Sequence, residues 1–283
     1  MPIKHIAVVG AGTMGNGIAQ VCATAGYSVT LIDVVPAALE QGLQSIRRSL
    51  GKLAEKGRIS PAQKEEVLQA ITPAGMLVAV ANAHLVIEAA TENPDLKLRI
   101  FRELDALTQP EVILASNTSS ISITRLGGAT RRADKVIGMH FMNPAPLMSL
   151  IEVVRGLGTS AETTATIMDL SRGLGKTPVE AKDSPGFISN RILCPMINEA
   201  IFALQEGIGT PEAIDTVMKL GMNHPMGPLA LCDLVGLDVV LFVMEVLQRD
   251  LGEDKYRPAP LLRRMVDAGY LGRKSGRGFY EYK

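Results

Sequence analysis

A histidine and a glutamate twelve positions apart have the residue types needed for proton transfer. His140 closes an apolar run in the segment GMHFMNPAP, and Glu152 follows in LIEVV with two apolar residues on each side. Histidine suits proton removal because imidazole titrates near working pH. Carboxylates are rarely buried among apolar side chains without a partner. If the two segments are neighbouring strands, the carboxylate can fix the imidazole tautomer and stabilise the imidazolium.

The other three histidines fit structural roles better. His5 opens an apolar run, His84 precedes one, and His224 lies in a proline-rich connection. His140 stands at the end of its run, and open α/β sheets bind ligands at the ends of their strands. The alternatives are a His140 held for structural reasons and a Glu152 on the solvent side of its strand.

A second constellation, near the N-terminus, has the spacing of a dinucleotide-binding loop. The segment VVGAGTMGNGIAQ places Gly10, Gly12 and Gly15 in the pattern G-x-G-x-x-G, directly after an apolar run. In that pattern the first glycine permits a tight turn and the second lets the backbone approach a pyrophosphate. The third allows helix and strand to pack closely, and the helix N-terminus favours an anion. A plain turn is the alternative, and Gly17 is interpreted as a helix-packing position.

The cofactor that this loop indicates is NAD(H). Asp33 ends the next apolar run, 18 residues after Gly15, near the spacing at which an acidic residue binds the adenosine ribose hydroxyls. No arginine follows within DVVPAA, and a carboxylate at this place repels a 2′-phosphate. We expect NAD(H) in preference to NADP(H), although one carboxylate alone does not rule out NADP(H).

A parallel sheet is needed to position these residues, and the chain has the pattern of one. Helical stretches at 14–25 and 94–107 alternate with runs that are apolar at nearly every position, typical of strands covered on both faces. The predicted strands are residues 5–10, 28–33, 84–89, 111–116, 135–140 and 149–154. This alternation predicts a Rossmann-like, doubly wound α/β domain with a mostly parallel sheet.

One connection in this domain is too long for a simple crossover, because 50 residues separate Asp33 from His84. The pattern predicts helices over 36–56 and 61–70, with Ser60 as the N-cap of the second. A helical hairpin therefore projects from the sheet. On residue pattern alone, its basic residues form a solvated face balanced by nearby glutamates. These basic residues are Arg47, Arg48, Lys52, Lys56 and Arg58.

The pattern changes after the segment KDSPGF, and helical periods follow one another to the last few residues. The predicted helices span 187–206, 211–220, 227–249 and 258–269. Ser184 with Pro185 is interpreted as a helix start and Thr210 as a cap. We place a domain boundary near 183, between a nucleotide-binding domain at 1–183 and an all-α domain at 184–283. Apolar helical surface in so small a domain suggests contact with another subunit.

Composition excludes several classes of function. The 283 residues include 29 basic and 29 acidic side chains, so no global field attracts nucleic acid or an anionic membrane. The three cysteines, Cys22, Cys194 and Cys232, are too dispersed for a disulfide framework or a zinc site. A strand-like segment begins by residue 3, and no apolar run is long enough for a membrane helix. We therefore expect no leader, no metal, and a location in the cytoplasm.

The chain resembles the L-3-hydroxyacyl-CoA dehydrogenase family over essentially its whole length. The segments that carry the resemblance are VVGAGTMGNGIAQ, EAATEN, SNTSSISIT, GMHFMNPAPLMSLIEVV, DSPGFISNRIL, HPMGPLALCDLVGLD and YLGRKSGRGFY. The resemblance implies reversible, NAD-dependent oxidation of an (S)-3-hydroxyacyl-CoA, with hydroxybutyryl-CoA as the expected substrate. It also implies a CoA thioester as the ligand, and we expect a homodimer formed through the C-terminal helical domain.

The resemblance further implies roles for single residues. His140 of the HFxNP motif matches the catalytic base and Glu152 its partner, while Ser119 and Asn190 match substrate contacts. On residue pattern alone, Ser119 fits a turn or cap and Asn190 a surface position. The implied cofactor contacts are Gly10, Ala11, Gly12, Thr13, Met14, Gly15, Asp33, Glu92, Lys97, Ser119, Asn143 and Lys274. The family binds CoA near the helical hairpin, which makes Lys52 and Lys56 candidates for its phosphates.

Two other functions fit the same sequence pattern. One is a related dehydrogenase that acts on a free hydroxy acid. The other is a non-catalytic protein that binds NAD as a structural or sensor group. Retention of both His140 and Glu152 argues against the second, because sensing needs no base. The substitution FMNPAP for the common FFNPVP leaves the polar residues of the motif unchanged, so it affects only the shape of the acyl pocket.

Overall fold

The computed structural model describes residues 2–282, and the chain divides into two compact units, Met1–Ser184 and Pro185–Lys283. Each unit has a hydrophobic core of its own. The boundary that we predicted near residue 183 lies next to this division.

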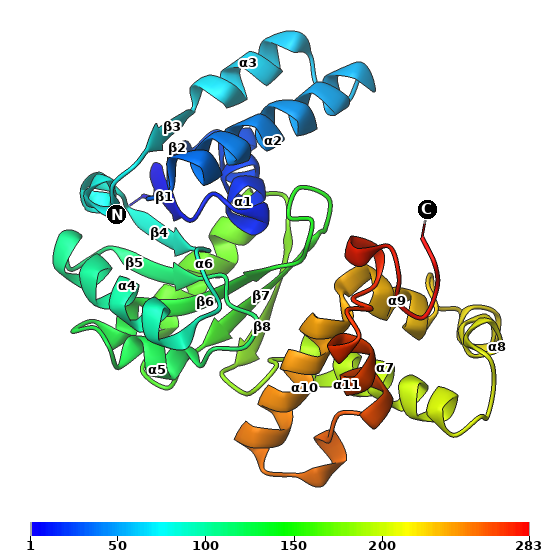
Figure 1. The fold of residues 1–283 in the computed structure, drawn as a ribbon. Coiled ribbons are helices and arrows are strands. Elements are labelled where there is room, and N and C mark those ends of the chain that lie inside the picture. Colours follow the sequence, from blue (N-terminus) through cyan, green and yellow to red (C-terminus); the bar gives the residue numbers. More distant parts are fainter. Residues whose placement is uncertain (1, 283) are drawn as a thin grey trace. The chain divides into compact units, whose positions relative to one another are not determined.

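The first unit is built on a sheet of eight strands in the order β3-β2-β1-β4-β5-β6-β7-β8 (Figure 1). Neighbouring strands run parallel, except that β6 and β7 are antiparallel. The strands are β1 His5–Val9, β2 Ser28–Ile32, β3 Ile71–Ala74, β4 Leu85–Glu88, β5 Ile113–Ser116, β6 Val136–Phe141, β7 Leu150–Arg155 and β8 Thr177–Lys182. The predicted fold class is confirmed: a Rossmann-like, mostly parallel sheet precedes an all-α unit.

Two of these strands were not predicted, and both lie at the edges of the sheet. β3 contains Pro73, which is tolerated at an edge because no outer strand needs its missing N–H. β8 exposes most of its side chains, so it lacks the continuous apolar run that marks the inner strands. An edge strand has a neighbouring strand on one side only and is less buried. Its sequence therefore shows a weaker run of apolar residues than that of an inner strand.

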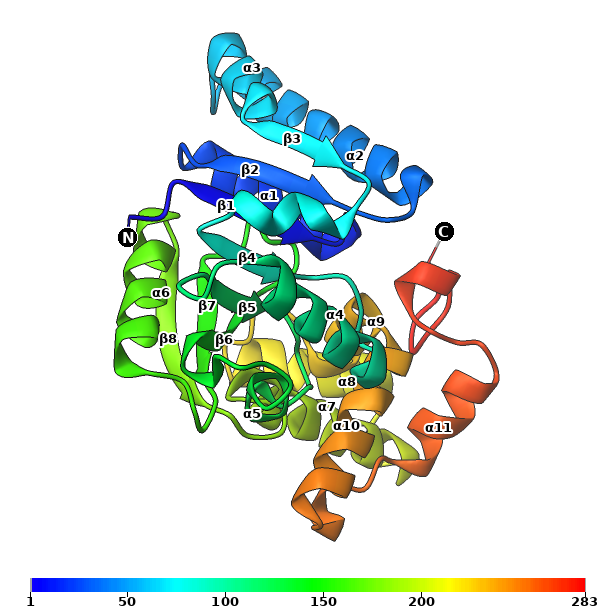
Figure 2. The same cartoon turned by 90° about the vertical axis from the view of Figure 1, so that its left-hand side faces the viewer.

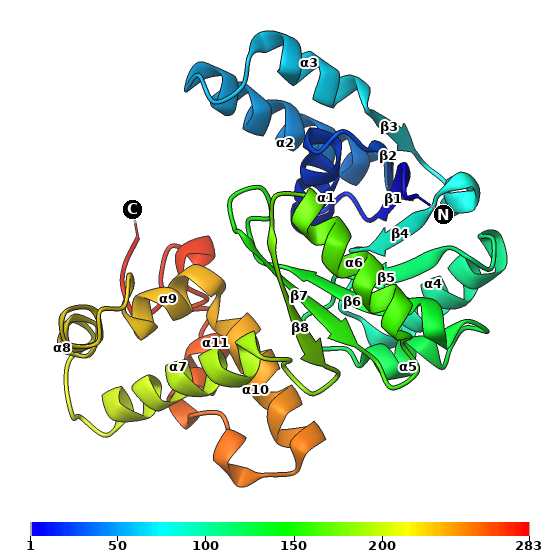
Figure 3. The same cartoon turned by 180° about the vertical axis from the view of Figure 1, so that it is seen from behind.

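Helices cover both faces of the sheet. Ile18 of α1, Ile46 of α2 and Ile167 of α6 share one core cluster with Ile6 and Val8 of β1. α4 and α5 lie on the opposite face, as the front and back views show (Figures 1 and 3). The helices of this unit are α1 Thr13–Thr24, α2 Pro36–Glu55, α3 Pro61–Gln69, α4 Pro94–Leu107, α5 Ile123–Gly127 and α6 Ala161–Gly173. The arrangement is doubly wound, as predicted.

α2 and α3 form the predicted helical hairpin, which extends from the β3 edge of the sheet (Figure 2). Ser60 caps α3: its side chain accepts the N–H of Gln63 at 3.1 Å, and the Gln63 side chain accepts the N–H of Ser60 at 2.8 Å. This capping box and Pro61 at the first helical position start the second helix where the sequence predicted.

The second unit consists of helices α7 Ser189–Gln205, α8 Pro211–Thr216, α9 Pro228–Val235, α10 Leu237–Leu251 and α11 Pro260–Asp267. Thr210 caps α8, as predicted. The predicted single helix over 227–249 is wrong, because Gly236, at φ +106°, ends α9 and begins α10. The helix start predicted at Ser184 and Pro185 is also wrong. Gly186 and Phe187 both have positive φ, so α7 begins only at Ser189.

The cysteines at positions 22, 194 and 232 are all buried and reduced. Burial raises the pKa of the Cys22 thiol to about 12, and it raises that of Cys194 to about 12 as well. Between residues 2 and 282, no helix combines the length and apolar character needed to cross a membrane.

Two buried carboxylates anchor the C-terminal segment to the second unit. Asp233 accepts the N–H groups of Phe279 at 2.9 Å and Tyr280 at 3.0 Å, and the hydroxyl of Tyr282 at 2.9 Å. Asp215 accepts the N–H of Leu229 at 2.8 Å and, in addition, the hydroxyl of Tyr280. Burial, followed by the bond to Asp215, raises the pKa of that tyrosine.

Replacing Asp233 with asparagine lowers the free energy of unfolding by about 3 kcal/mol, because an amide N–H₂ then faces a buried donor and a charge-assisted bond is lost. Urea denaturation measures the change. Asp267→Asn, at an exposed position of α11, is the matched control and leaves stability within about 0.5 kcal/mol. Equal midpoints for the two variants would contradict the anchoring role of Asp233.

Candidate active site

The glycine loop joins β1 to α1, and its geometry explains each glycine of the pattern. Gly10 has φ +99°, and a Cβ there would come within 2.6 Å of the Ala89 oxygen and the Ala90 Cα. A Cβ on Gly15 would collide with the carbonyl of Gly10. A Cβ on Gly12, by contrast, meets nothing within 4 Å. The first and third glycines therefore allow close packing, while the second faces open space through which a ligand can approach the backbone.

Two further features of this edge favour an anionic nucleotide. α1 begins at Thr13, and its N-cap, Gly12, has no side chain to cap it, so the first N–H groups of the helix are presented at the loop. Asp33 lies beside the loop: its Oδ2 accepts the N–H of Ala11 at 2.9 Å, and its Oδ1 accepts that of Val35 at 2.9 Å. Gly17 has the packing role we expected, since a Cβ there would lie 3.2 Å from the Ala145 Cβ.

Replacing Asp33 with asparagine raises the Kd for NADH about tenfold and lowers the Kd for NADPH, because the charge that repels a 2′-phosphate is lost. Fluorescence titration of both nucleotides measures the ratio of the two Kd values. Asp95→Asn, at an exposed carboxylate in the first turn of α4, is the control for an unspecific charge effect. An unchanged NADH to NADPH ratio in the Asp33 variant would contradict its role at the ribose.

His140 and Glu152 face each other on the antiparallel strands β6 and β7. The imidazole Nδ1 lies 2.8 Å from Oε2 of the glutamate. His140 is 8% exposed and Glu152 1% exposed, so the contact is shielded from water. The solvent-facing alternative for Glu152 is therefore wrong, and the contact that the strand pattern predicted is present. The contact at Nδ1 orients the imidazole ring and sets its tautomer.

The end of β6 and the segment between β6 and β7 are each held by a side chain from another part of the first unit. Asn117, after β5, accepts the N–H of Phe141 through Oδ1 at 2.8 Å, next to His140. Lys176 donates through Nζ to the carbonyls of Ala145 and Met148, each at 2.7 Å. Burial lowers the pKa of the Lys176 ammonium. The contact with Asn117 fixes the backbone next to His140, and the contacts with Lys176 fix the segment between β6 and β7.

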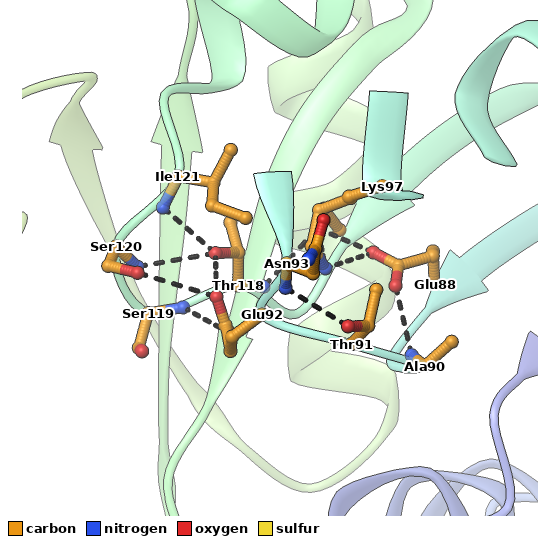
Figure 4. A network of polar contacts seen from close by, with 11 residues as sticks. Glu88, Ala90, Thr91, Glu92, Asn93, Lys97, Thr118, Ser119, Ser120 and Ile121 are labelled. Carbon is orange, nitrogen blue, oxygen red and sulfur yellow. Dashed lines mark hydrogen bonds and ion pairs between the residues drawn. The ribbon is translucent and has the colours of Figure 1, made fainter. Parts of the chain in front are cut away.

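Glu92 connects the loop after β4 to the loop after β5 (Figure 4). Its Oε2 accepts the hydroxyl of Thr118 at 2.8 Å, and its Oε1 accepts the N–H of Ser119 at 3.1 Å. A longer bond of 3.4 Å joins it to the hydroxyl of Ser120. Two residues predicted as cofactor contacts, Glu92 and Ser119, are thus brought together although 27 positions separate them.

Lys97, which the family resemblance implied as a cofactor contact, is buried. It is 1% exposed, and its ammonium forms an ion pair with the buried carboxylate of Glu88 and lies 3.3 Å from Oγ of Ser116. The group is therefore part of the interior below the two loops. Its contact with a cofactor stays a prediction.

The remaining predicted residues lie on several elements. Asn143 is exposed after β6 and precedes Pro144 through a cis peptide bond. Lys52 and Lys56 are exposed at the end of α2. In the second unit, Asn190 lies in the first turn of α7, as expected, and Lys274 donates to Asp238 at 2.7 Å.

His5 and His84 have the expected structural contacts, since the N–H of His5 donates to Nδ1 of His84 at 3.2 Å.

Sequence reasoning missed Glu88 and Asn117. Glu88 ends the apolar run LVIE, and the argument applied to Glu152, that a carboxylate inside a buried strand needs a partner, would have found it. Asn117 carries no comparable signal, because an asparagine after a strand is also an ordinary turn residue.

Family models match almost the whole chain. The model for the 3-hydroxyacyl-CoA dehydrogenase NAD binding domain matches residues 5–184. The model for the 3-hydroxyacyl-CoA dehydrogenase C-terminal domain matches residues 186–282.

Similar proteins agree with these matches over their full lengths. A probable 3-hydroxybutyryl-CoA dehydrogenase of Bacillus subtilis is 54% identical, over 100% of this chain and 99% of the relative. A 3-hydroxybutyryl-CoA dehydrogenase of Bradyrhizobium diazoefficiens is 50% identical, over 99% of this chain and 96% of the relative. The crystal structure of (S)-3-hydroxybutyryl-CoA dehydrogenase from Ralstonia eutropha superposes with a TM-score of 0.97 at 53% identity, with 100% of each chain covered.

Proposed function

The chain belongs to the 3-hydroxyacyl-CoA dehydrogenase family, and we propose that it interconverts (S)-3-hydroxybutyryl-CoA and acetoacetyl-CoA with NAD(H). The observation that carries the proposal is the buried contact between His140 and Glu152, at 2.8 Å. It supplies a proton acceptor in the same unit as a glycine loop that fits a dinucleotide.

The residues around the glycine loop fit NAD(H). Gly12 leaves the backbone open to a pyrophosphate, the uncapped start of α1 presents N–H donors, and Asp33 places a carboxylate for the ribose hydroxyls. When bound, NAD⁺ accepts the hydride that leaves C3 of the hydroxyacyl group. Glu92, Ser119 and Asn143 are the further contacts that we propose on this unit.

The chain's part in the reaction is the movement of one proton. In the oxidation, Nε2 of His140 takes the hydroxyl proton while C3 loses its hydride, so that the C–O bond becomes a carbonyl. The imidazole becomes an imidazolium, and the carboxylate of Glu152 stabilises that charge at Nδ1. Because both groups are buried, water screens this attraction little. In the reduction, the same imidazolium returns the proton to the forming alkoxide.

Four residues complete the proposed substrate site. Ser119 holds the reacting oxygen, which orients it for the proton transfer. Asn190, in the second unit, is a further proposed substrate contact. Lys52 and Lys56, both exposed on the hairpin, bind phosphates of CoA. We retain these four assignments from the resemblance. The positive charges of the hairpin support the assignment of Lys52 and Lys56 to the phosphates.

The proposed assembly is a homodimer formed through the second unit. Several large apolar side chains of that unit are exposed, and exposed apolar surface is typical of contact sites. They include Ile192 at 65%, Ile208 at 75%, Leu220 at 83% and Met222 at 61%. A second copy that covers them accounts for their exposure, and sedimentation equilibrium measures the mass of the assembly. We propose the cytoplasm as the location.

Turnover of acetoacetyl-CoA, followed by loss of NADH absorbance, tests the proposed function. The proposal predicts turnover of acetoacetyl-CoA and none of acetoacetate. Turnover of acetoacetate alone would identify a dehydrogenase of a free hydroxy acid. Binding of NADH without turnover of either compound would identify a non-catalytic NAD-binding protein.

A further inference from the structure

We propose that Glu88 is a positioning residue, which holds the loops after β1, β4 and β5 in the arrangement that catalysis needs. This inference rests on the proposed function, because NAD(H) and the acyl-CoA are the ligands that these loops are proposed to share. Glu88 lies below the loops, and it contacts one proposed cofactor contact directly, Lys97.

The carboxylate of Glu88 receives three donors from different segments, although it is fully buried. Oε1 accepts the N–H of Ala90, in the loop after β4, at 2.9 Å. Oε2 accepts the hydroxyl of Ser116, at the end of β5, at 2.9 Å. The ammonium of Lys97, from α4, forms an ion pair with the same oxygen (Figure 4). One side chain therefore joins a helix, a strand end and a loop.

The contact with Ala90 extends to the glycine loop. Gly10 lies so close to Ala89 and Ala90 that a Cβ would come within 2.6 Å of their backbone atoms. The N–H of Ala89 also donates to the carbonyl of Val9 at 2.7 Å. The backbone that Glu88 fixes is thus the surface against which the first glycine of the nucleotide loop packs.

The contact with Ser116 extends to the loop that carries Ser119. Oγ of Ser116 accepts the N–H of Thr118 at 3.3 Å, while it donates its own proton to Glu88. The hydroxyl of Thr118 in turn donates to Glu92, which accepts the N–H of Ser119. A chain of hydrogen bonds therefore leads from the buried carboxylate to two proposed ligand contacts.

The carboxylate of Glu88 suits this position. It accepts hydrogen bonds and donates none, so it satisfies all three donors, and Lys97 balances its charge. A well-packed apolar pair of similar volume is often as stable as a buried ion pair. Stability alone therefore does not explain the ion pair, whereas fixing three loops does.

The first test removes the link to the loop after β5. Ser116→Ala leaves the ion pair in place but breaks the bond to Thr118. We expect kcat/KM for acetoacetyl-CoA to fall about tenfold, the scale of a small misplacement of reacting groups. We expect the NADH Kd to rise as well, because Glu92 and Ser119 are proposed NAD(H) contacts. Ser171→Ala is the matched control, because Ser171 is equally buried and its hydroxyl donates only to the carbonyl of Ile167, at 2.7 Å, within α6. The control leaves both quantities unchanged.

The second test isolates Glu88 from any direct contact that Lys97 makes with the cofactor. Lys97→Met is compared with the double variant Glu88→Leu/Lys97→Met, since Lys97 is absent from both. We expect the double variant to have a further tenfold higher NADH Kd, on the order of the loss of one or two positioning bonds, because Ala90 loses its acceptor. Calorimetry gives the Tm of both variants and shows whether each one folds. If the double variant does not fold, the kcat/KM of Ser116→Ala tests the proposal by itself.

Two outcomes would overturn the inference. One is a Ser116→Ala variant with the kcat/KM of the Ser171→Ala control. The other is a folded double variant with the NADH Kd of Lys97→Met. Failure of the wild-type chain to reduce acetoacetyl-CoA would instead overturn the proposed function, and the NADH Kd comparison would still decide whether Glu88 positions the nucleotide loop.

Discussion

Replacing His140 with glutamine lowers kcat for acetoacetyl-CoA reduction by about 10²-fold or more, the scale of a lost general acid or base. Glutamine has nearly the size of histidine and keeps a polar group beside Glu152, but its amide does not exchange a proton at working pH. The NADH Kd stays at the wild-type value, because the contacts of the glycine loop do not involve β6. Steady-state kinetics and fluorescence titration measure the two quantities.

The matched control for this variant is His84→Gln. His84 is half-buried in the same unit and accepts the N–H of His5, so the variant tests whether loss of any partly buried histidine impairs turnover. We expect its kcat within about twofold of wild type, because single substitutions away from a site act mainly on stability. An unimpaired kcat in His140→Gln would remove the proposed base from the mechanism.

Replacing Glu152 with glutamine also lowers kcat, by about 10²-fold, although the side chain keeps its shape. The amide oxygen can still accept the N–H at Nδ1, but it carries no charge to stabilise the imidazolium. The effect is large because the site is buried, with Glu152 1% exposed. Steady-state kinetics on the purified variant give the loss.

The control for Glu152 lies on the adjacent strand. Glu180 of β8 is half-exposed and binds Arg155 at 3.1 Å, so Glu180→Gln removes a carboxylate from the same part of the sheet. It leaves kcat unchanged. The double variant His140→Gln/Glu152→Gln loses no more activity than His140→Gln alone, because residues that act as a unit are not additive. Additive losses would show that Glu152 acts independently of the imidazole.

The inner part of the sheet could be predicted because its strands have a strong signal. Residues 5–9, 28–32 and 85–88 are mostly apolar and are buried at nearly every position, so both faces of each strand are covered. β3 and β8 escaped prediction because an edge strand does not need that pattern. Gly236 escaped as a break because a single glycine within an apolar period is compatible with a continuous helix.

Some residues of the candidate site could also be predicted from the sequence, and others could not. The contact between His140 and Glu152 could be predicted from two segments, because antiparallel neighbours place opposite residues side by side. Glu92 and Ser119 lie in separate loops, and no local pattern reveals which loops meet. Ser119 and Asn190 were selected by resemblance alone. A buried carboxylate such as Glu88 could have been found from its apolar neighbours, but not its three donors, which come from distant segments.

The central claim is that the chain moves a hydride and a proton between a 3-hydroxyacyl-CoA and NAD(H). It is tested most directly with (S)-3-hydroxybutyryl-CoA that carries deuterium at C3, incubated with NAD⁺ and the wild-type protein. Mass spectrometry then determines where the deuterium goes. The account predicts one deuterium in the NADH for each acetoacetyl-CoA formed. Acetoacetyl-CoA formed alongside NADH without deuterium, or no acetoacetyl-CoA at all, would contradict it.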